Sequence, residues 1–124
     1  MNPRILVVDD NPANLELILY LLRAFGYEAH AARDGLEGWV AAQTGDYHLI
    51  LTDILMPGID GYEFARRLAG LPKRPRIVAV TALAMAGDRD RMLAAGFDDY
   101  LSKPIDPVAF RQHIEDALGK HPRR

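Results

Sequence analysis

Five short apolar runs recur along this chain of 124 residues, and a segment with the spacing of a helix follows each of them. The runs cover residues 5–8, 28–31, 49–52, 77–80 and 100–101. The first, third and fourth consist almost only of apolar residues, which is typical of strands buried on both faces of a sheet. A strand followed by a helix, repeated five times, predicts a five-stranded parallel sheet with right-handed crossovers and helices on both faces. We therefore expect a doubly wound α/β fold.

Four of the five helical segments have the apolar spacing of an amphipathic helix, and we expect each to place one face on the core. Their apolar residues are Leu15, Ile18, Leu19 and Leu22; Leu36, Trp39 and Val40; Phe64, Ala65, Leu68 and Leu71; and Phe110, Ile114 and Leu118. The segment at residues 85–95 is weaker because its apolar residues are mostly alanine and the run Arg89-Asp90-Arg91 interrupts it. We still expect a helix there.

Capping residues stand at the expected helix boundaries. Asn11 and Asp106 each precede a proline, and Asp60 with Glu63 resembles a capping box. Glycines stand where three helices should end, at positions 26, 96 and 119. Because no linker, repeat or low-complexity stretch interrupts this pattern, we expect residues 1–124 to form a single domain.

Composition excludes several classes of function. The net charge of −2 argues against a surface built to bind nucleic acid, although Arg123 and Arg124 end the chain. There is no cysteine, and hence no disulfide or thiol chemistry. The first residues lack the layout of a signal peptide, and no apolar run approaches the ~20 residues that cross a bilayer. We expect a soluble, cytoplasmic protein.

The residues just beyond the predicted strands carry the chemistry, because ligands of open parallel sheets bind at the carboxyl ends of the strands. Asp9 and Asp10 follow the first strand, Asp53 the third, Thr81 the fourth and Lys103 the fifth. Three converging carboxylates repel one another, which indicates a bound cation or a raised pKa. Ligands that are all oxygen favour Mg²⁺. The alternative for Asp9 and Asp10 is that they only stabilise the following helix through its dipole.

Side-chain length matches the distances that the predicted sheet imposes. If the first and third strands are neighbours, their ends lie ~4.8 Å apart, so Asp10 and Asp53 can share one ion. The fifth strand lies roughly 10 Å from the third, a distance that the long side chain of Lys103 can cross, whereas Thr81 on the strand between needs only a short one. Together with a divalent ion these groups form a cradle for a phosphoryl group.

Over nearly its whole length the chain resembles the receiver domains of bacterial two-component response regulators, the CheY-like superfamily. The matching motifs are Val-Asp-Asp-Asn at 8–11, Thr-Asp-Ile-Leu-Met-Pro at 52–57, Asp-Gly at 60–61, Val-Thr-Ala at 80–82 and Tyr-Leu-Ser-Lys-Pro at 100–104. Residues 9–14 and 82–88 are most similar to DivK-like single-domain receivers and to receivers attached to hybrid histidine kinases. The resemblance implies a flavodoxin-like sheet with strand order 2-1-3-4-5.

The resemblance also assigns roles at the site. It implies that Asp53 is the phosphoacceptor, that Asp10 binds Mg²⁺ directly and Asp9 through water, and that the backbone carbonyl of Leu55 is a further ligand. Mn²⁺ is a possible substitute for Mg²⁺. Lys103 is implied to pair with the phosphoryl oxygens.

Two switch residues and one unusual peptide bond are implied as well. On phosphorylation Thr81 is expected to move to hydrogen-bond the phosphoryl group, and Tyr100 to follow inward. The bond between Lys103 and Pro104 is expected to be cis, which X-Pro bonds adopt at modest cost.

The implied function is phosphorelay signalling. A histidine kinase or histidine phosphotransfer protein donates a phosphoryl group from a phosphohistidine to Asp53. The domain is then a slowly self-dephosphorylating switch rather than an enzyme. Phosphorylation changes the surface formed by the fourth helix, fifth strand and fifth helix, where a downstream target binds. We expect a monomer or a phosphorylation-linked dimer, without a nucleic-acid or membrane partner.

Three alternatives remain open. A hydrolase with an aspartyl-phosphate intermediate needs an acidic residue two positions beyond the nucleophile, where this chain has Leu55. A flavodoxin-like binder of FMN needs a phosphate-binding loop after the first strand, where Asp9 and Asp10 would repel phosphate. A receiver-like scaffold that is never phosphorylated would have no need of all five chemical positions.

Overall fold

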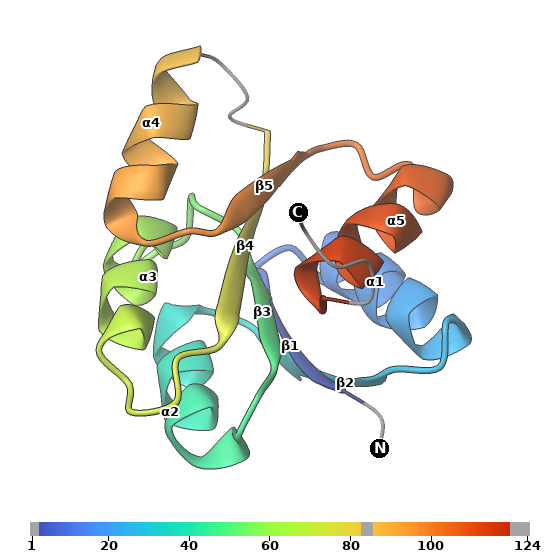
Figure 1. Ribbon diagram of the computed structural model, residues 1–124, viewed down its shortest axis with the longest axis horizontal. Coiled ribbons are helices and arrows are strands. Elements are labelled where there is room, and N and C mark those ends of the chain that lie inside the picture. The colour runs from blue at the N-terminus through green and yellow to red at the C-terminus, as the bar shows by residue number, and fades with distance from the viewer. Residues whose placement is uncertain (1–2, 83–85, 120–124) are drawn as a thin grey trace.

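The computed structural model describes residues 3–82 and 86–119, which form one parallel sheet with helices on both sides (Figure 1). The strands are β1 (Arg4–Val8), β2 (Glu28–Ala32), β3 (Leu49–Thr52), β4 (Arg76–Thr81) and β5 (Asp99–Ser102). The helices are α1 (Pro12–Ala24), α2 (Gly35–Gly45), α3 (Gly61–Ala69), α4 (Ala86–Ala95) and α5 (Pro107–Ala117). The strand order β2-β1-β3-β4-β5 confirms the expected fold class and topology.

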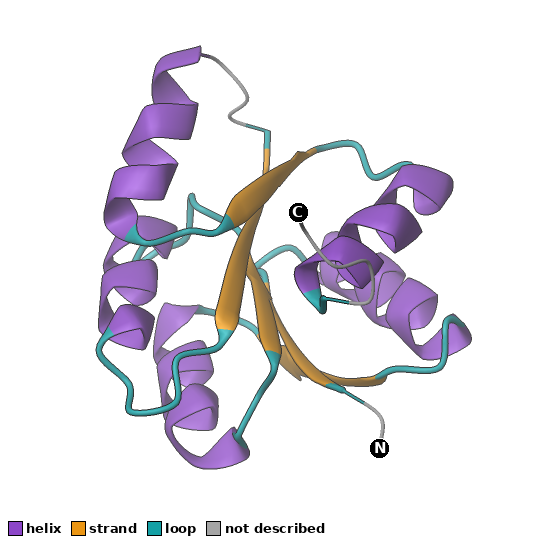
Figure 2. Ribbon diagram, in the orientation of Figure 1, coloured by secondary structure: helices purple, strands orange, loops and turns teal. Residues whose placement is uncertain are grey.

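Two hydrophobic cores lie on opposite faces of the sheet (Figure 2). Alternate residues of each strand point to opposite faces, so Ile5 and Val7 join α1 and α5 in one core, while Leu6 and Val8 join α2, α3 and α4 in the other. These four side chains are at most 1% exposed. The expectation that the central strands are buried on both faces is therefore confirmed.

Of the three expected core residues of helix α2, only Trp39 packs against the core. Leu36 and Val40 are 61% and 57% exposed, and Trp39 is only half-buried. The buried face consists of glycines instead, and a Cβ at Gly38 would lie 2.9 Å from a methyl group of Val8. The apolar spacing was wrong for Leu36 and Val40 because α2 approaches the sheet through glycines, which hydrophobic periodicity does not record.

The helix ends follow the expected caps with two exceptions. The side chain of Asn11 accepts two backbone N–H groups in the first turn of α1, and that of Asp60 accepts the N–H of Glu63 in α3. Asp106 begins α5 without a side-chain capping bond. The carboxylate of Glu63 pairs with Arg66 and Arg67 on its own helix, so the reciprocal half of a capping box is not its role.

Some predicted boundaries shift, and some predicted residues fall outside the description. Leu71 and Leu118 lie just beyond the last residues of α3 and α5. Met85, Arg123 and Arg124 are outside the described residues. Within residues 3–82 and 86–119, no helix is both long enough and apolar enough to cross a membrane.

Candidate functional site

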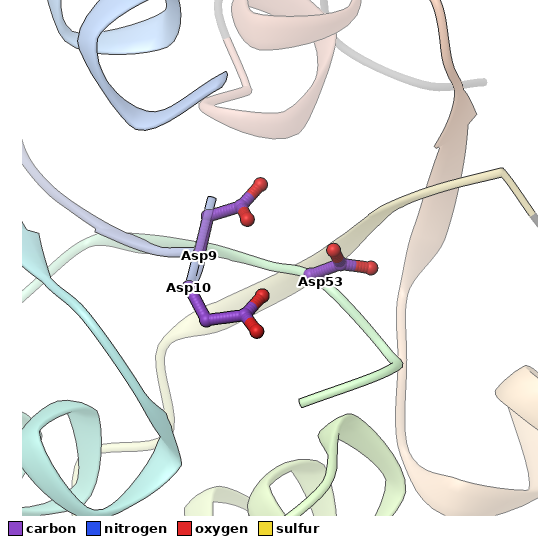
Figure 3. Close-up of side chains that lie close together, drawn as sticks. All are labelled: Asp9, Asp10 and Asp53. Atoms are coloured by element: carbon purple, nitrogen blue, oxygen red, sulfur yellow. The ribbon is translucent and has the colours of Figure 1, made fainter. Parts of the chain in front are cut away.

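Three carboxylates meet at the carboxyl ends of β1 and β3 (Figure 3). Asp9, Asp10 and Asp53 each offer one oxygen atom, and these atoms lie within 4.8 Å of one another. Asp9 is buried at 2% exposure, Asp53 is half-buried and Asp10 is exposed. One rim of the cluster is therefore open to solvent, and its donors suit a hard divalent cation such as Mg²⁺.

Backbone hydrogen bonds fix the two less exposed carboxylates. The N–H of Asn11 donates to Asp9 Oδ1 over 2.9 Å, and the N–H of Ile54 donates to Asp53 Oδ1 over 2.7 Å. The N–H of Asp53 donates to the carbonyl of Val8 over 3.0 Å, which continues the pairing of β1 with β3 beyond the strands. The second oxygen of each carboxylate, Oδ2, accepts no backbone N–H in these bonds and faces the Lys103 ammonium instead.

Lys103 reaches this cluster from the edge strand β5. Its Nζ lies 3.0 Å from Asp53 Oδ2 and 3.3 Å from Asp9 Oδ2. Because β4 separates β5 from β3, only a long side chain could make this contact, as the sequence indicated. The peptide bond between Lys103 and Pro104 is cis.

The remaining candidate residues lie around the same strand ends. Thr81 ends β4 and is 1% exposed, and its carbonyl accepts the backbone N–H of Lys103 over 2.9 Å. Tyr100 lies on β5, half-buried against the core beneath α3 and α4. Leu55, two residues beyond Asp53, is 65% exposed. Leu83, the corresponding residue beyond Thr81, lies outside the described residues.

The electrostatics of the cluster are those of a site with excess negative charge. Burial raises the pKa of Asp9, against the opposing effects of the Asn11 hydrogen bond and of the Lys103 charge. Burial alone would lower the pKa of Lys103, but its hydrogen bond to Asp53 and the charges of Asp53 and Asp9 outweigh burial and raise it. Lys103 is therefore a cation at neutral pH, and the ionised form of Asp9 is costly.

This cost predicts that Asp9→Asn stabilises the metal-free chain. Because the pKa of Asp9 is higher in the folded state, ionised Asp9 destabilises the fold at neutral pH, and the destabilisation fades as pH falls through the folded pKa. Asparagine keeps an oxygen for the Asn11 N–H and has no charge to desolvate. We expect a higher unfolding temperature than for the parent in chelator at neutral pH, and a smaller difference as pH is lowered toward about 4. Thermal unfolding followed by circular dichroism measures both.

Mg²⁺ provides the control for this prediction. The ion should raise the unfolding temperature of the parent more than that of Asp9→Asn, because the variant has lost a charge near the ion. A variant that is less stable than the parent in chelator would show that the Asp9 carboxylate is not a net cost to the fold.

Gly61 supports the site although sequence reasoning gave it no role of its own. Its N–H donates to the carbonyl of Ile54 over 2.8 Å. A Cβ at this position would lie 2.5 Å from the Asp53 carbonyl oxygen and 2.6 Å from the Ile54 Cα, so only glycine lets α3 begin this close to the acidic loop. The glycine directly after a helix-capping aspartate was the signal that could have suggested such a close approach.

Comparison with known proteins then decides the family. The sequence matches the model of the response regulator receiver domain over residues 5–115. The chain belongs to this family. Receiver domains serve as phosphoacceptor switches in phosphorelay signalling, where they interact with histidine kinases and downstream targets.

The receiver is similar to curated proteins of two kinds. It is 44% identical over 121 residues to the sensor protein GacS of Pseudomonas syringae pv. syringae, a match that covers 90% of this chain and only 13% of GacS. It is 37% identical over 121 residues to the polar-differentiation response regulator DivK of Brucella ovis, a match that covers 96% of this chain and 98% of DivK. The chain thus resembles both a small part of a long sensor kinase and nearly all of a single-domain regulator.

Solved structures agree with the receiver fold. The receiver domain of a sensor histidine kinase from Pseudomonas aeruginosa PAO1, with a magnesium ion coordinated in its active-site cleft, is 35% identical with a TM-score of 0.88. That match covers 96% of this chain and 99% of the other. A CheY-like receiver from Methanospirillum hungatei JF-1 is 30% identical with a TM-score of 0.90, covering 97% of this chain and 96% of the other.

Proposed function

We propose that this receiver takes a phosphoryl group onto Asp53 from a phosphohistidine of a histidine kinase or histidine phosphotransfer protein, with Mg²⁺ bound at the acidic cluster. The observation that carries the proposal is that the Asp53 carboxylate belongs to the acidic cluster and also contacts the Lys103 ammonium. Asp53 lies within 4.8 Å of the Asp9 and Asp10 oxygens and also accepts a hydrogen bond from the Lys103 ammonium over 3.0 Å. A carboxylate between a metal site and a fixed cation is suited to attack phosphorus.

The transfer is a nucleophilic displacement. A carboxylate oxygen of Asp53 attacks phosphorus, an acyl O–P bond forms, the N–P bond of the phosphohistidine breaks, and the imidazole leaves with the electron pair. Asp10, Asp53, Asp9 through water, and the Leu55 carbonyl would hold Mg²⁺, or Mn²⁺ in its place, and a bound ion would supply neutralisation of charge on the phosphoryl oxygens. Lys103 also binds those oxygens, and the Thr81 hydroxyl donates a hydrogen bond to them.

The output is a population shift. Phosphorylation favours a state in which Thr81 and Tyr100 have moved toward the phosphoryl group, and the surface of α4, β5 and α5 then binds a downstream target. Residues 1–124 make up one receiver domain that acts in the cytoplasm, as a monomer or as a phosphorylation-linked dimer. The two alternative chemistries are less suitable, because Leu55 cannot act as the acid or base of a hydrolase and the paired carboxylates would repel a flavin phosphate.

Mg²⁺-dependent phosphorylation tests this function. We expect intact-mass analysis to find one added phosphoryl group after incubation with Mg²⁺ and acetyl phosphate, and none when a chelator removes the ion. The adduct should be labile to base and to hydroxylamine, as acyl phosphates are. Absence of an adduct with Mg²⁺, with Mn²⁺ and with a phosphorylated histidine phosphotransfer protein would favour the scaffold alternative.

The apolar residue beyond the acceptor predicts a long-lived phosphoryl group. Leu55 is exposed beside the acidic loop and has no polar atom in its side chain to orient an attacking water. We expect Leu55→Asn to accelerate loss of phosphate several-fold, and Leu55→Met to leave the rate unchanged. The measurement is the decay of the phosphorylated mass after the donor is removed. Equal rates for Leu55→Asn and the parent would contradict this role.

A further inference from the structure

A cationic groove lies at the end of the sheet opposite the acidic cluster. Figure 1 shows the ribbon at this end, where β1, β3 and β4 begin. Its volume is about 780 Å³. The groove is lined by four cationic side chains and two carboxylates, the cations being Arg4, Lys73, Arg74 and Arg76. On a chain with net charge −2, this groove is a local region of opposite sign.

The floor of the groove is a fixed backbone ladder. The N–H of His48 donates to the carbonyl of Arg4 over 2.9 Å, and the N–H of Arg76 donates to the carbonyl of His48 over 3.0 Å. These bonds extend the sheet pairing by one residue before β3, so the backbone of His48 is joined to Arg4 and Arg76, the first residues of β1 and β4. The backbone positions that carry these two arginines are therefore fixed before any ligand arrives.

Two of the four cations are already engaged. Arg4 pairs with Glu28 over 3.1 Å and stacks over the ring of Tyr47. Arg74 pairs with Asp98 over 3.0 Å, and the same carboxylate accepts the backbone N–H of Ile77. These contacts fix the side chains of Arg4 and Arg74 in the lining of the groove.

The other two cations are available to a ligand. Lys73 and Arg76 are exposed, and within residues 3–82 and 86–119 their side chains make no ion pair or hydrogen bond. Between them lies the buried Pro75, and the groove is completed by Pro3 and by Leu118 at the end of α5. The groove thus combines two unpaired cations, Lys73 and Arg76, with apolar lining residues.

We propose that this groove docks an acidic, extended peptide segment of a partner protein. Two carboxylates of the segment pair with Lys73 and Arg76, and an apolar side chain between them contacts Pro75 and Leu118. A compact polyphosphate such as a nucleotide fits less well, because Asp46 and Asp98 in the lining repel concentrated negative charge. A peptide spreads its charges along the groove and can keep them away from these two carboxylates.

The position of the groove separates docking from phosphoryl transfer. Five residue steps along β3 separate His48 from Asp53, roughly 16 Å at the rise of a strand. A bound segment therefore leaves the acidic cluster open to a phosphodonor. In a long multidomain relative such as GacS, a weak contact of this kind would act at high effective concentration.

The test is an NMR titration of the ¹⁵N-labelled chain with an end-blocked Glu-Leu-Glu-Leu-Glu peptide. We expect shifts of the backbone amides at Tyr47, His48, Lys73, Arg74 and Arg76, and none from the matched Gln-Leu-Gln-Leu-Gln peptide. The double variant Lys73→Glu with Arg76→Glu should weaken binding more than about tenfold, because it removes two exposed ion pairs that together account for about tenfold and adds repulsion between like charges. Lys73→Gln with Arg76→Gln should weaken binding less, and a dispersed spectrum confirms that each variant is folded.

A second double variant separates the groove from bulk charge. Arg66→Glu with Arg111→Glu changes the net charge equally on exposed residues of α3 and α5, outside the groove. It should bind the acidic peptide nearly as the parent does. Equal weakening by both double variants, shifts that map elsewhere, or tighter binding of ATP than of the peptide at the same amides would each overturn the proposal. Because no phosphoryl donor is used, these outcomes are independent of phosphorylation at Asp53.

Discussion

Asp53→Asn should abolish phosphorylation of this receiver by acetyl phosphate and by a phosphorylated histidine phosphotransfer protein. The amide is nearly isosteric with the carboxylate, and its oxygen can still accept the N–H of Ile54, which now lies 2.7 Å from Asp53 Oδ1. What disappears is the nucleophile, because an amide oxygen does not form a stable acyl phosphate. We expect the phosphorylated fraction seen by intact-mass analysis to fall by about a hundredfold or more.

Asp46→Asn is the matched control for this substitution. Asp46 is an exposed carboxylate at the other end of the sheet, in a left-handed backbone conformation (φ 49°) that asparagine adopts readily. It should be phosphorylated as the parent is, with the same dependence on Mg²⁺. Retained phosphorylation in Asp53→Asn would place the acceptor on another residue, which fragmentation of the phosphorylated chain would identify.

The positions of the strand ends, and the meeting of their polar residues, were predictable from the apolar runs together with the rule of parallel pairing. The apolar runs place Asp9, Asp53, Thr81 and Lys103 directly after strands, and parallel pairing brings all such ends to one edge. Because β4 lies between β5 and β3, a side chain that follows β5 must be long to reach Asp53, and the Lys103 side chain is long enough. Topology and side-chain length together therefore predicted a contact across fifty residues of sequence, from Lys103 to Asp53.

The sequence did not predict how closely the backbones of α2 and α3 approach their neighbours. Gly38 brings α2 against Val8, and Gly61 brings α3 against the carbonyl of Asp53, but hydrophobic periodicity records only large apolar side chains. The cationic groove was invisible for a different reason. Arg4, His48 and Arg76 are distant in sequence and become neighbours only through backbone hydrogen bonds at the starts of β1, β3 and β4.

Lys103→Gln should raise the affinity for Mg²⁺ and lower the rate of phosphoryl transfer. The Lys103 ammonium lies 3.0 Å from Asp53 and 3.3 Å from Asp9, so it partly neutralises the carboxylates that the proposed Mg²⁺ site requires. Without that charge, the uncompensated carboxylates should bind Mg²⁺ several-fold more tightly, as measured by calorimetric titration. Phosphoryl transfer should nevertheless fall about a hundredfold, because the variant lacks the cation that we propose binds the phosphoryl oxygens in the transition state.

Stability and a charge-conserving variant complete this prediction. In chelator, Lys103→Gln should lose about 2 kcal/mol of unfolding free energy in urea, less than for a fully buried pair because the Lys103 side chain keeps 19% exposure. Mg²⁺ should restore much of the loss by supplying the missing positive charge. Lys103→Arg keeps that charge and should bind Mg²⁺ nearly as the parent does. If Lys103→Gln instead weakened Mg²⁺ binding and transfer together, Lys103 would act by holding the acidic loop in place, and its ammonium would have no separate part in the transfer.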